Sequence, residues 1–295
     1  MVDPVTHPEV QHLTVADGID LHVVTRGMSG PRRPMLLVHG LASNARLWDG
    51  VAEHLAAAGH PVVAVDQRGH GRSSKPDHGY DFATLVDDLC RVSDLLDLER
   101  PVAVGQSWGG NVVVEFAARR PDRIAGVVAV DGGFIELGRQ FPSWDDCRAT
   151  LTPPPLVGTP HEVIESYLRR AHPTWPESGI HGTLANFERR ADGTIAPWLT
   201  LERHLTILGE LYRHRPRDVF ARIDLPVLFV PADSGHHERT AVTRRAVDEA
   251  LDLLADGRVH WFAPADHDVH AQYPREVAAV LGAFARSLDD PPEDR

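Results

Sequence analysis

Short apolar runs alternate along this chain with longer segments in which apolar residues recur at helical spacing. Two strands are predicted within residues 10–27, on either side of an Asp17–Gly18 turn. Further buried strands are predicted at 34–40, 60–66, 101–105, 124–133, 225–232 and 258–264. Helices are predicted at 44–58, 82–98, 111–119, 239–254 and 275–288. Such alternation is typical of an α/β fold, in which helices cover both faces of a mostly parallel sheet.

The alternation stops between residues 134 and 222. This segment is rich in proline, holds three of the six tryptophans, and has helical spacing only at 160–171 and 200–213. Because the strand pattern resumes at Leu225, we expect a helical cap at 134–222 that is inserted into the α/β core. A second, independent domain is the alternative. The core would then comprise residues 1–133 and 223–295.

The composition is that of an ordinary globular chain and narrows the range of partners. With 295 residues, of which 42% are hydrophobic, the chain can bury a large core. The net charge of -12 and the lack of a basic stripe argue against nucleic acid and against an anionic membrane surface. We therefore expect a small-molecule substrate as the partner, and a monomer or a homodimer.

The chain ends and the cysteines point to no export signal, membrane anchor or metal. Residues 1–10 are polar and contain prolines, unlike a signal peptide, and no apolar run approaches the roughly 18 residues of a membrane span. Cys90 and Cys147 are isolated thiols without zinc-binding spacing or a disulfide framework. We expect a cytoplasmic protein without a metal or a cofactor, in which the tail 289–295 is disordered.

A single serine stands between two glycines where a predicted strand meets a predicted helix. The stretch GQSWG, with Ser107 at its centre, directly follows the apolar run 101–105. Serine is a poor nucleophile unless a base removes its proton and hydrogen-bond donors stabilise the oxyanion that forms. The glycines allow close backbone packing and a strained serine, and the start of a helix favours negative charge. The pattern predicts that Ser107 is a catalytic nucleophile.

With three further loops, this serine makes the chain similar to the α/β-hydrolase family over nearly its whole length. The loops are LLVHGLASN from Leu36, VDQRGHGRSS from Val65 and ADHDVHAQYPREV from Ala265. The resemblance implies a cofactor-free hydrolase in which the N–H groups of Leu41 and Trp108 form the oxyanion hole. It also implies that His267 is the catalytic histidine, with His270 as a weaker alternative.

The acid of the expected triad has two candidates, each at the end of a predicted strand. Asp131 ends the strand that begins at residue 124, and Asp233 lies two residues before the acid position of the commoner family pattern. We favour Asp131, whose placement resembles that in a subgroup of haloalkane dehalogenases. Those enzymes use an aspartate as nucleophile, so Ser107 indicates acyl chemistry in place of dehalogenation or epoxide hydrolysis.

Together these residues predict a serine hydrolase that cleaves a carboxylic ester or lactone of a small to medium apolar substrate. Four residues are expected to line the substrate pocket: Trp108, His39, Gly40 and Trp144. Asp66, Arg68 and His70 are expected to form a structural loop and not a metal site. Alternatives that remain open are a carbon–carbon bond hydrolase, a thioesterase, an aminopeptidase, an acyltransferase, and a small-molecule receptor that hydrolyses slowly.

Overall fold

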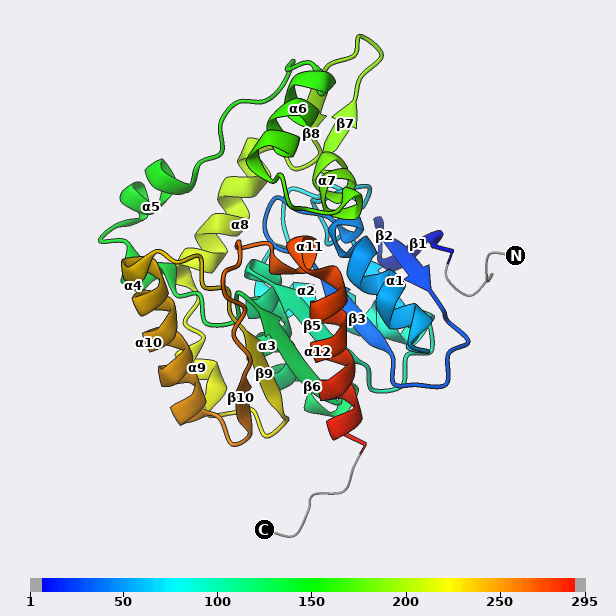
Figure 1. Ribbon diagram of the computed structural model, residues 1–295, viewed down its shortest axis with the longest axis vertical. Coiled ribbons are helices and arrows are strands. Elements are labelled where there is room, and N and C mark those ends of the chain that lie inside the picture. Colours follow the sequence, from blue (N-terminus) through cyan, green and yellow to red (C-terminus); the bar gives the residue numbers. More distant parts are fainter. Residues whose placement is uncertain (1–6, 290–295) are drawn as a thin grey trace.

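The computed structural model describes residues 7–289 and is built around one eight-stranded sheet (Figure 1). Its strands follow the order β1 (Glu9–Ala16), β2 (Ile19–Arg26), β4 (Val62–Val65), β3 (Met35–Val38), β5 (Val102–Gln106), β6 (Gly126–Val130), β9 (Val227–Val230) and β10 (Gly257–Val259). β2 is antiparallel to both of its neighbours, whereas every pair from β4 to β10 is parallel. The α/β class predicted from the sequence is confirmed.

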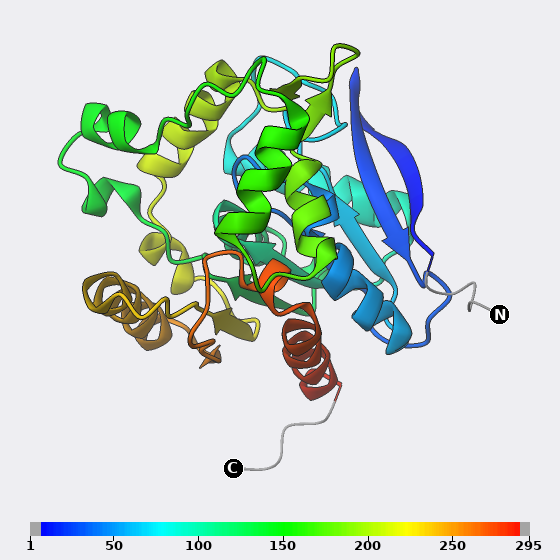
Figure 2. The ribbon, with the colours of Figure 1, turned by 45° about the horizontal axis from the view of Figure 1, so that its top comes forward.

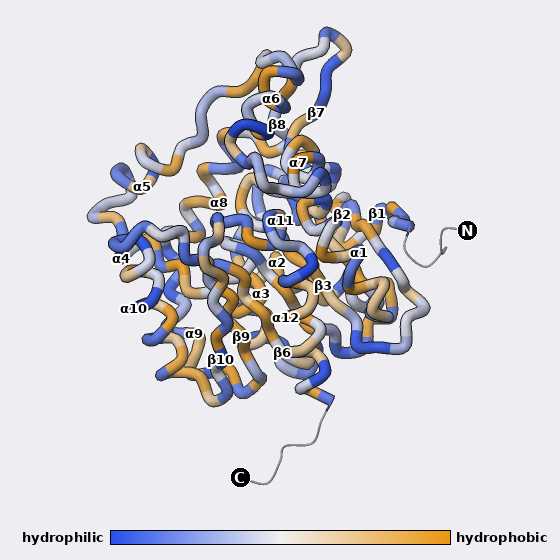
Figure 3. The backbone as a smooth tube through the Cα atoms, viewed as in Figure 1, coloured by the Kyte–Doolittle hydropathy of each residue, from blue (hydrophilic) through white to orange (hydrophobic). Residues whose placement is uncertain are grey.

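Helices cover both faces of this sheet. α1 (Asp49–Ala57) and α12 (Pro274–Ser287) pack on one face, and the other carries α2 (Phe82–Leu95), α3 (Trp108–Arg119), α9 (Arg217–Phe220) and α10 (His237–Leu253). Successive strand residues alternate between the two cores: Leu36 and Val38 face α2 and α3, and Met35 and Leu37 face α1 and α12. Strands that are buried on both sides are apolar throughout, so the centre of the sheet is strongly hydrophobic in Figure 3.

The chain between β6 and α9 leaves the sheet and forms an insertion of helices and one hairpin. It contains α4 (Leu137–Gln140), α5 (Trp144–Leu151), α6 (His161–Ala171), α7 (Glu177–Leu184), β7 (Phe187–Arg189), β8 (Ile195–Pro197) and α8 (Leu201–Arg213). Figures 1 and 2 show α6, α7 and α8 together at one end of the sheet. An apolar cluster that includes Ile164, Trp175 and Ile180 packs α6 and α7 against α11 (Val269–Gln272).

Within this insertion, α6 and α8 lie where helical spacing predicts them, but the hairpin was not predicted. β7 and β8 have three residues each, too few to show an alternating pattern, and the turn between them includes Gly193 with a φ of +82°. The strand predicted at 258–264 is too long. The corresponding strand, β10, lies at the edge of the sheet with one neighbour and ends at Val259. Beyond that residue a single bridge joins Phe262 to Ala232.

The helix predicted at 44–58 begins as a 3₁₀ turn, Ala45–Trp48, and continues as α1. The Asn44 side chain accepts a hydrogen bond from the Arg46 N–H and so caps the turn. Nearly all of the tail that was expected to be disordered lies outside the described residues. Within residues 7–289, no helix is both long and apolar enough to cross a membrane.

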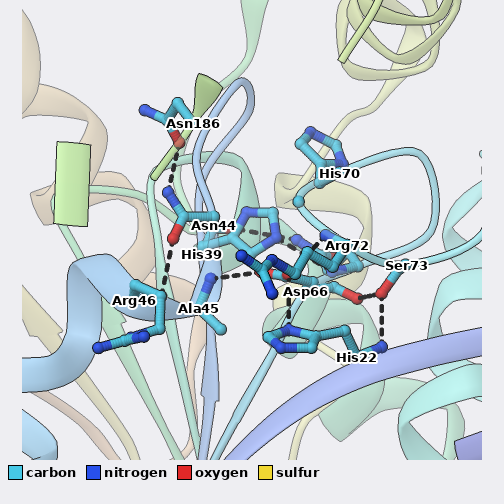
Figure 4. A network of polar contacts seen from close by, with 12 residues as sticks. His22, His39, Asn44, Ala45, Arg46, Asp66, His70, Arg72, Ser73 and Asn186 are labelled. Atoms are coloured by element: carbon cyan, nitrogen blue, oxygen red, sulfur yellow. Dashed lines mark hydrogen bonds and ion pairs between the residues drawn. The ribbon is translucent and has the colours of Figure 1, made fainter. Parts of the chain in front are cut away.

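A buried polar network holds the loops that follow β3 and β4 (Figure 4). Asp66, directly after β4, accepts hydrogen bonds from the Ala45 N–H at 2.7 Å and the Arg72 N–H at 2.8 Å. Its Oδ2 atom also lies 2.8 Å from Nδ1 of His22. A Cβ atom at Gly71 would lie 2.0 Å from the carboxylate, so only glycine leaves room for it there. Both carboxylate oxygens are therefore occupied by the protein itself.

The same region fixes His39, in the loop that leads to Leu41. The Gln67 N–H donates to His39 Nε2 at 3.0 Å, and the Gln67 side-chain amide donates to the His39 carbonyl at 2.8 Å. Since Nε2 accepts a hydrogen bond, the ring proton lies on Nδ1, which donates to the Gly40 carbonyl at 2.7 Å. Burial lowers the pKa of His39, so the ring is neutral in this position. These bonds hold the backbone of Leu41 in place.

The charge of Asp66 contributes to stability in a defined pH range. Burial raises the pKa of this carboxyl, but the hydrogen bond from His22, attraction to His39 and His22 when these rings are protonated, and the N–H of Ala45 together lower it to about 2. The folded state therefore binds the proton more weakly than an unfolded chain, in which the pKa is 3.8. The stabilisation is complete above that value and is lost as the pH falls to about 2.

We expect Asp66→Asn to lower the free energy of unfolding at pH 7 by about 2 kcal/mol, and we expect this difference to shrink between pH 4 and pH 2. Urea titrations of both proteins across this range measure the difference. Asp122→Asn, at an exposed position, is the matched control and should change stability by less than about 0.5 kcal/mol at every pH. A difference for Asp66→Asn that does not vary with pH would contradict this role of the charge.

Candidate active site

Ser107 lies in a strained turn between β5 and α3. Its φ of 53° and ψ of -122° fall in a region that residues with a side chain rarely adopt. Neighbouring glycines make the turn possible. A Cβ atom at Gly105 would lie 2.1 Å from the Gly109 carbonyl oxygen, and one at Gly109 would lie 2.5 Å from the carbonyl oxygens of Val38 and His39. The turn holds Ser107 at the carboxyl end of a central strand.

Two other loops at the carboxyl edge of the sheet bring a carboxylate and an imidazole together. Asp131 directly follows β6, the neighbour of β5, and His267 lies in the loop that leads from β10 to α11. His267 Nδ1 is 2.5 Å from Asp131 Oδ2, and Asp131 Oδ1 accepts the Ala232 N–H at 3.0 Å. Because the carboxylate engages Nδ1, the Nε2 atom of His267 is left to exchange a proton.

The pKa of His267 lies above its ordinary value. Burial lowers the pKa, but the hydrogen bond to Asp131 and the negative charges of Asp268 and Asp131 outweigh this effect. The His267 side chain is 38% exposed and that of Asp131 only 11%, so solvent and ligands can reach the ring and hardly reach the acid. The site therefore combines an accessible imidazole with a covered carboxylate, and the carboxylate favours the protonated form of the imidazole.

Ser107 and His267 line the same pocket, which has a volume of about 380 Å³ and which we call the reaction pocket. Leu41 and Trp108 also border it. Within residues 7–289, neither the Leu41 N–H nor the Trp108 N–H donates a hydrogen bond to a protein acceptor. Trp108 is the first residue of α3, where helix N–H groups have no partner in the helix and the helix dipole favours negative charge. The pocket can therefore stabilise an oxyanion beside Ser107.

Comparison with known proteins agrees with the fold. A family model described as alpha/beta hydrolase fold matches residues 33–152. A solved structure of an E-2-(acetamidomethylene)succinate hydrolase superposes with a TM-score of 0.76 and 24% sequence identity, and the match covers 95% of this chain and 100% of that one. The chain has the α/β-hydrolase fold, which agrees with the resemblance that the sequence motifs imply.

Two relatives match this chain along most of its length. A non-heme chloroperoxidase of Streptomyces lividans is 26% identical, over 88% of this chain and 94% of its own length. A 2-(acetamidomethylene)succinate hydrolase of Mesorhizobium japonicum is 28% identical, over 90% of this chain and 91% of its own length. These relatives support a hydrolytic enzyme and do not specify its substrate.

The alternative acid, Asp233, has partners other than the histidine. Its Oδ1 atom accepts the Gly235 N–H at 2.9 Å and the Thr240 hydroxyl at 2.7 Å. These hydrogen bonds lower the pKa of Asp233 and tie its carboxylate to the first turn of α10. The structure thus places Asp131 beside His267 and gives Asp233 other partners.

The alternative histidine, His270, lies beneath the surface on α11. Its ring is 4.2 Å from that of Trp48, measured between centroids, and only 1% of the residue is exposed. Burial lowers the pKa of His270 to about 3, so the ring stays neutral. Its surroundings are those of a residue in the core of the fold, and it does not line the reaction pocket.

Two of the expected pocket residues, His39 and Gly40, do not line the pocket. His39 is completely buried, and both of its ring nitrogens form hydrogen bonds. Gly40 packs against the serine turn, since a Cβ atom there would lie 2.4 Å from Gln106 Oε1. The prediction for these two residues is wrong because they support the loop from within, while the backbone of Leu41 borders the pocket.

Of the two expected tryptophans, Trp108 lines the reaction pocket and Trp144 does not. Trp144, on α5, packs on Tyr212 of α8 with ring centroids 5.6 Å apart, and it does not line the reaction pocket. Trp108 borders the pocket, but its side chain is completely buried, with its ring 5.4 Å from that of His70. Its indole therefore belongs to the core of the fold.

Gln106 and Asp268 belong to the surroundings of the site but were not assigned a role from the sequence. The Gln106 side-chain amide donates to the His267 carbonyl at 3.3 Å and to Asp268 Oδ1 at 3.2 Å. Burial raises the pKa of Asp268, while the positive charges of His267 and His172 oppose that effect. Gln106 precedes the serine directly, and this adjacency is the one signal in the sequence that could have drawn attention to it.

We expect Asp131→Asn to lower the pKa of His267, because the substitution removes both the charge and the charge-assisted hydrogen bond at Nδ1. NMR titration of the His267 ring follows this pKa without any substrate. Asp233→Asn is the control and should leave the pKa of His267 where it is. The pairing would be wrong if the two substitutions changed that pKa equally.

Proposed function

We propose that this protein is a cofactor-free serine hydrolase that cleaves a carboxylic ester or lactone through an acyl-enzyme. The observation that carries this proposal is the arrangement at the reaction pocket. A serine in a strained turn shares the pocket with a histidine whose Nδ1 is held by a carboxylate, and two unpaired N–H groups lie beside it. Each part has a task in acyl transfer, and together they supply nucleophile, base and oxyanion donors.

In the first half of the reaction, His267 Nε2 takes the proton of Ser107 while Oγ forms a bond to the ester carbonyl carbon. The N–H groups of Leu41 and Trp108 stabilise the negative charge on the carbonyl oxygen. Asp131 stabilises the imidazolium. The carbon–oxygen bond to the alcohol then breaks, the alcohol takes the proton from His267, and the acyl group remains on Oγ.

In the second half, water takes the place of the alcohol. His267 accepts a proton from the water as its oxygen bonds to the acyl carbon, and the same N–H groups stabilise the second oxyanion. The bond to Ser107 Oγ breaks, Oγ regains the proton from His267, and the carboxylic acid leaves. A lactone follows the same steps, and its alcohol remains attached to the acyl group as a hydroxy acid.

The lining of the reaction pocket favours an apolar group next to the ester. Its wall on the side of the insertion is formed by apolar residues: Phe134, Ile135, Leu137, Leu151, Leu208 and Leu211. A second cavity of about 680 Å³, which we call the proline-loop cavity, lies beside the loop 152–157. It is lined mainly by apolar residues, among them Leu156, Phe187, Ala196 and Trp198.

The two cavities meet at His204. This residue lines both, and the residues on either side of the junction are neighbours in sequence: Leu41 and Leu151 line the reaction pocket, and Ala42 and Thr152 line the proline-loop cavity. The His204 Nε2–H donates to the Leu151 carbonyl at 3.3 Å. Burial lowers the pKa of His204, so the junction is uncharged. This continuity favours a substrate whose apolar arm extends from the ester past His204.

We expect Ser107→Ala to reduce kcat for activated esters at least about a thousandfold, since the substitution removes the proposed nucleophile that forms the acyl-enzyme. Intact-protein mass spectrometry after a fluorophosphonate probe should find one adduct on the wild type and none on Ser107→Ala. Asp131→Asn should lower kcat at least about a hundredfold, and Asp233→Asn should leave it within about twofold. No adduct on folded wild-type protein would contradict the proposal and favour a receptor.

We expect Ala196→Phe, which fills part of the proline-loop cavity, to lower kcat/KM for long-chain 4-nitrophenyl esters or long-chain alkyl butanoates about tenfold. Short members of both series should change by less than about twofold, because they do not extend past His204. Thermal unfolding of the variant checks that the fold is kept. Equal losses for short and long members of both series would contradict an extended apolar site.

A further inference from the structure

The reaction pocket is polar on the side opposite its apolar wall. That side is formed by the loop before α10 and by the first two turns of the helix, and it includes Ser234, Arg239, Thr240 and Thr243. Arg239 is the only lysine or arginine among the residues that line the pocket. An apolar substrate would contact the opposite wall and leave this cation and its polar neighbours without a ligand group to bind.

Arg239 has no carboxylate partner among the residues that the structure describes. The ion pairs of residues 7–289 include neither Arg239 nor Arg245, one and a half turns further along α10. Nearby arginines differ in this respect: Arg139 lies 2.7 Å from Glu249, and Arg217 lies 2.9 Å from Glu136. The two glutamates that line this face, Glu136 and Glu249, are thus engaged by Arg139 and Arg217, and the guanidinium of Arg239 forms no ion pair within the described residues.

The reaction pocket continues into a third cavity of about 560 Å³ along this face of α10, which we call the arginine cavity. Both cavities are lined by Phe134, Gln140, Arg239 and Val242. Four arginines line the arginine cavity against two glutamates, an excess of positive charge in a chain whose net charge is -12. The local excess comes from the two unpaired residues, Arg239 and Arg245, and it favours a negatively charged ligand.

The charge of Arg239 also acts at the reacting groups. Beside the larger effects of burial, Asp131 and Asp268, it lowers the pKa of His267. The guanidinium is therefore close enough to influence the base electrostatically. A ligand that spans from Ser107 to Arg239 stays within the joined cavities.

We propose that Arg239, with Arg245 behind it, binds a carboxylate at the end of the substrate remote from the apolar wall. The substrate class is then an amphipathic ester or lactone that carries a carboxylate. A guanidinium offers two parallel N–H donors to a carboxylate, which makes this pairing directional as well as electrostatic. The proposal rests on the proposed function, because it takes the ester to lie at Ser107.

The experiment compares charged and neutral esters of the same shape. One pair is 4-carboxyphenyl butanoate with 4-carbamoylphenyl butanoate, which places the charge on the leaving group. The other is 4-nitrophenyl hydrogen suberate with its methyl ester, which places the charge on the acyl chain. In at least one pair, Arg239→Gln should lower the preference for the charged ester, measured as the ratio of kcat/KM values, about fivefold or more. Arg245→Gln should lower it less.

The matched control is Arg244→Gln on the same helix. The Arg244 guanidinium lies over the Trp261 ring, 4.4 Å from its centroid, and Arg244 lines neither the reaction pocket nor the arginine cavity. This variant should leave the preference for the charged ester unchanged. The difference between Arg239→Gln and wild type should also shrink in about 0.5 M salt, where exposed charges are screened.

The outcomes separate this inference from the proposed function. If wild type hydrolyses the neutral esters through Ser107 and Arg239→Gln keeps the full preference for the charged ones, the carboxylate site is overturned and the hydrolase stands. If no ester is hydrolysed, the proposed function fails, and binding measurements test whether the carboxylate site exists. Suberate and 4-hydroxybenzoate are then titrated calorimetrically into Ser107→Ala with and without Arg239→Gln. Weaker binding with the second substitution supports the site, and equal or no binding overturns it.

Discussion

Close backbone contact around one serine is the constraint on which the rest of the site depends. The backbone of Ser107 and its flanking glycines touches β3 on one side and the loop after β6 on the other. A Cβ atom at Gly132 would lie 2.2 Å from the Ser107 carbonyl oxygen, and one at Gly109 would meet the carbonyls that end β3. Three chain segments are thus locked together without intervening side chains. The strained φ of Ser107 persists because these contacts leave no room to relax it.

The histidine reaches this assembly from the far edge of the sheet, and its loop needs separate support. The backbone of Asp233 provides part of it, since the Ala265 N–H donates to the Asp233 carbonyl at 2.9 Å. The indole N–H of Trp175, in the insertion, donates to Asp266 Oδ2 at 3.0 Å. Gln106 joins the loop to the serine turn. The distance between the base and its acid therefore depends on both the core and the insertion.

The sequence indicates a site residue where a reactive residue type occurs at a recognisable position of the backbone. Ser107 stands out because glycine, serine and a strand-to-helix junction occur together, and the order of the strands follows from apolar runs of sufficient length. Periodicity cannot choose between Asp131 and Asp233, since both follow strands. The choice depends on how each carboxylate turns at its strand end. His39 and Trp144 were assigned to the pocket wrongly for the same reason: proximity along the chain and residue type do not determine the direction of a side chain.

The charges around His267 have to satisfy two opposite demands. In the proposed mechanism, the imidazole must be neutral to accept the serine proton and must then hold that proton for the leaving alcohol, so a pKa far from the working pH would impede one of the two steps. Asp131 and Asp268 raise the pKa, and burial and Arg239 lower it. Asp131 acts through a direct hydrogen bond and also fixes the ring, whereas Asp268 and Arg239 act only through their charge. A carboxylate bound at Arg239 would offset that positive charge and raise the pKa of His267 only while a substrate is present.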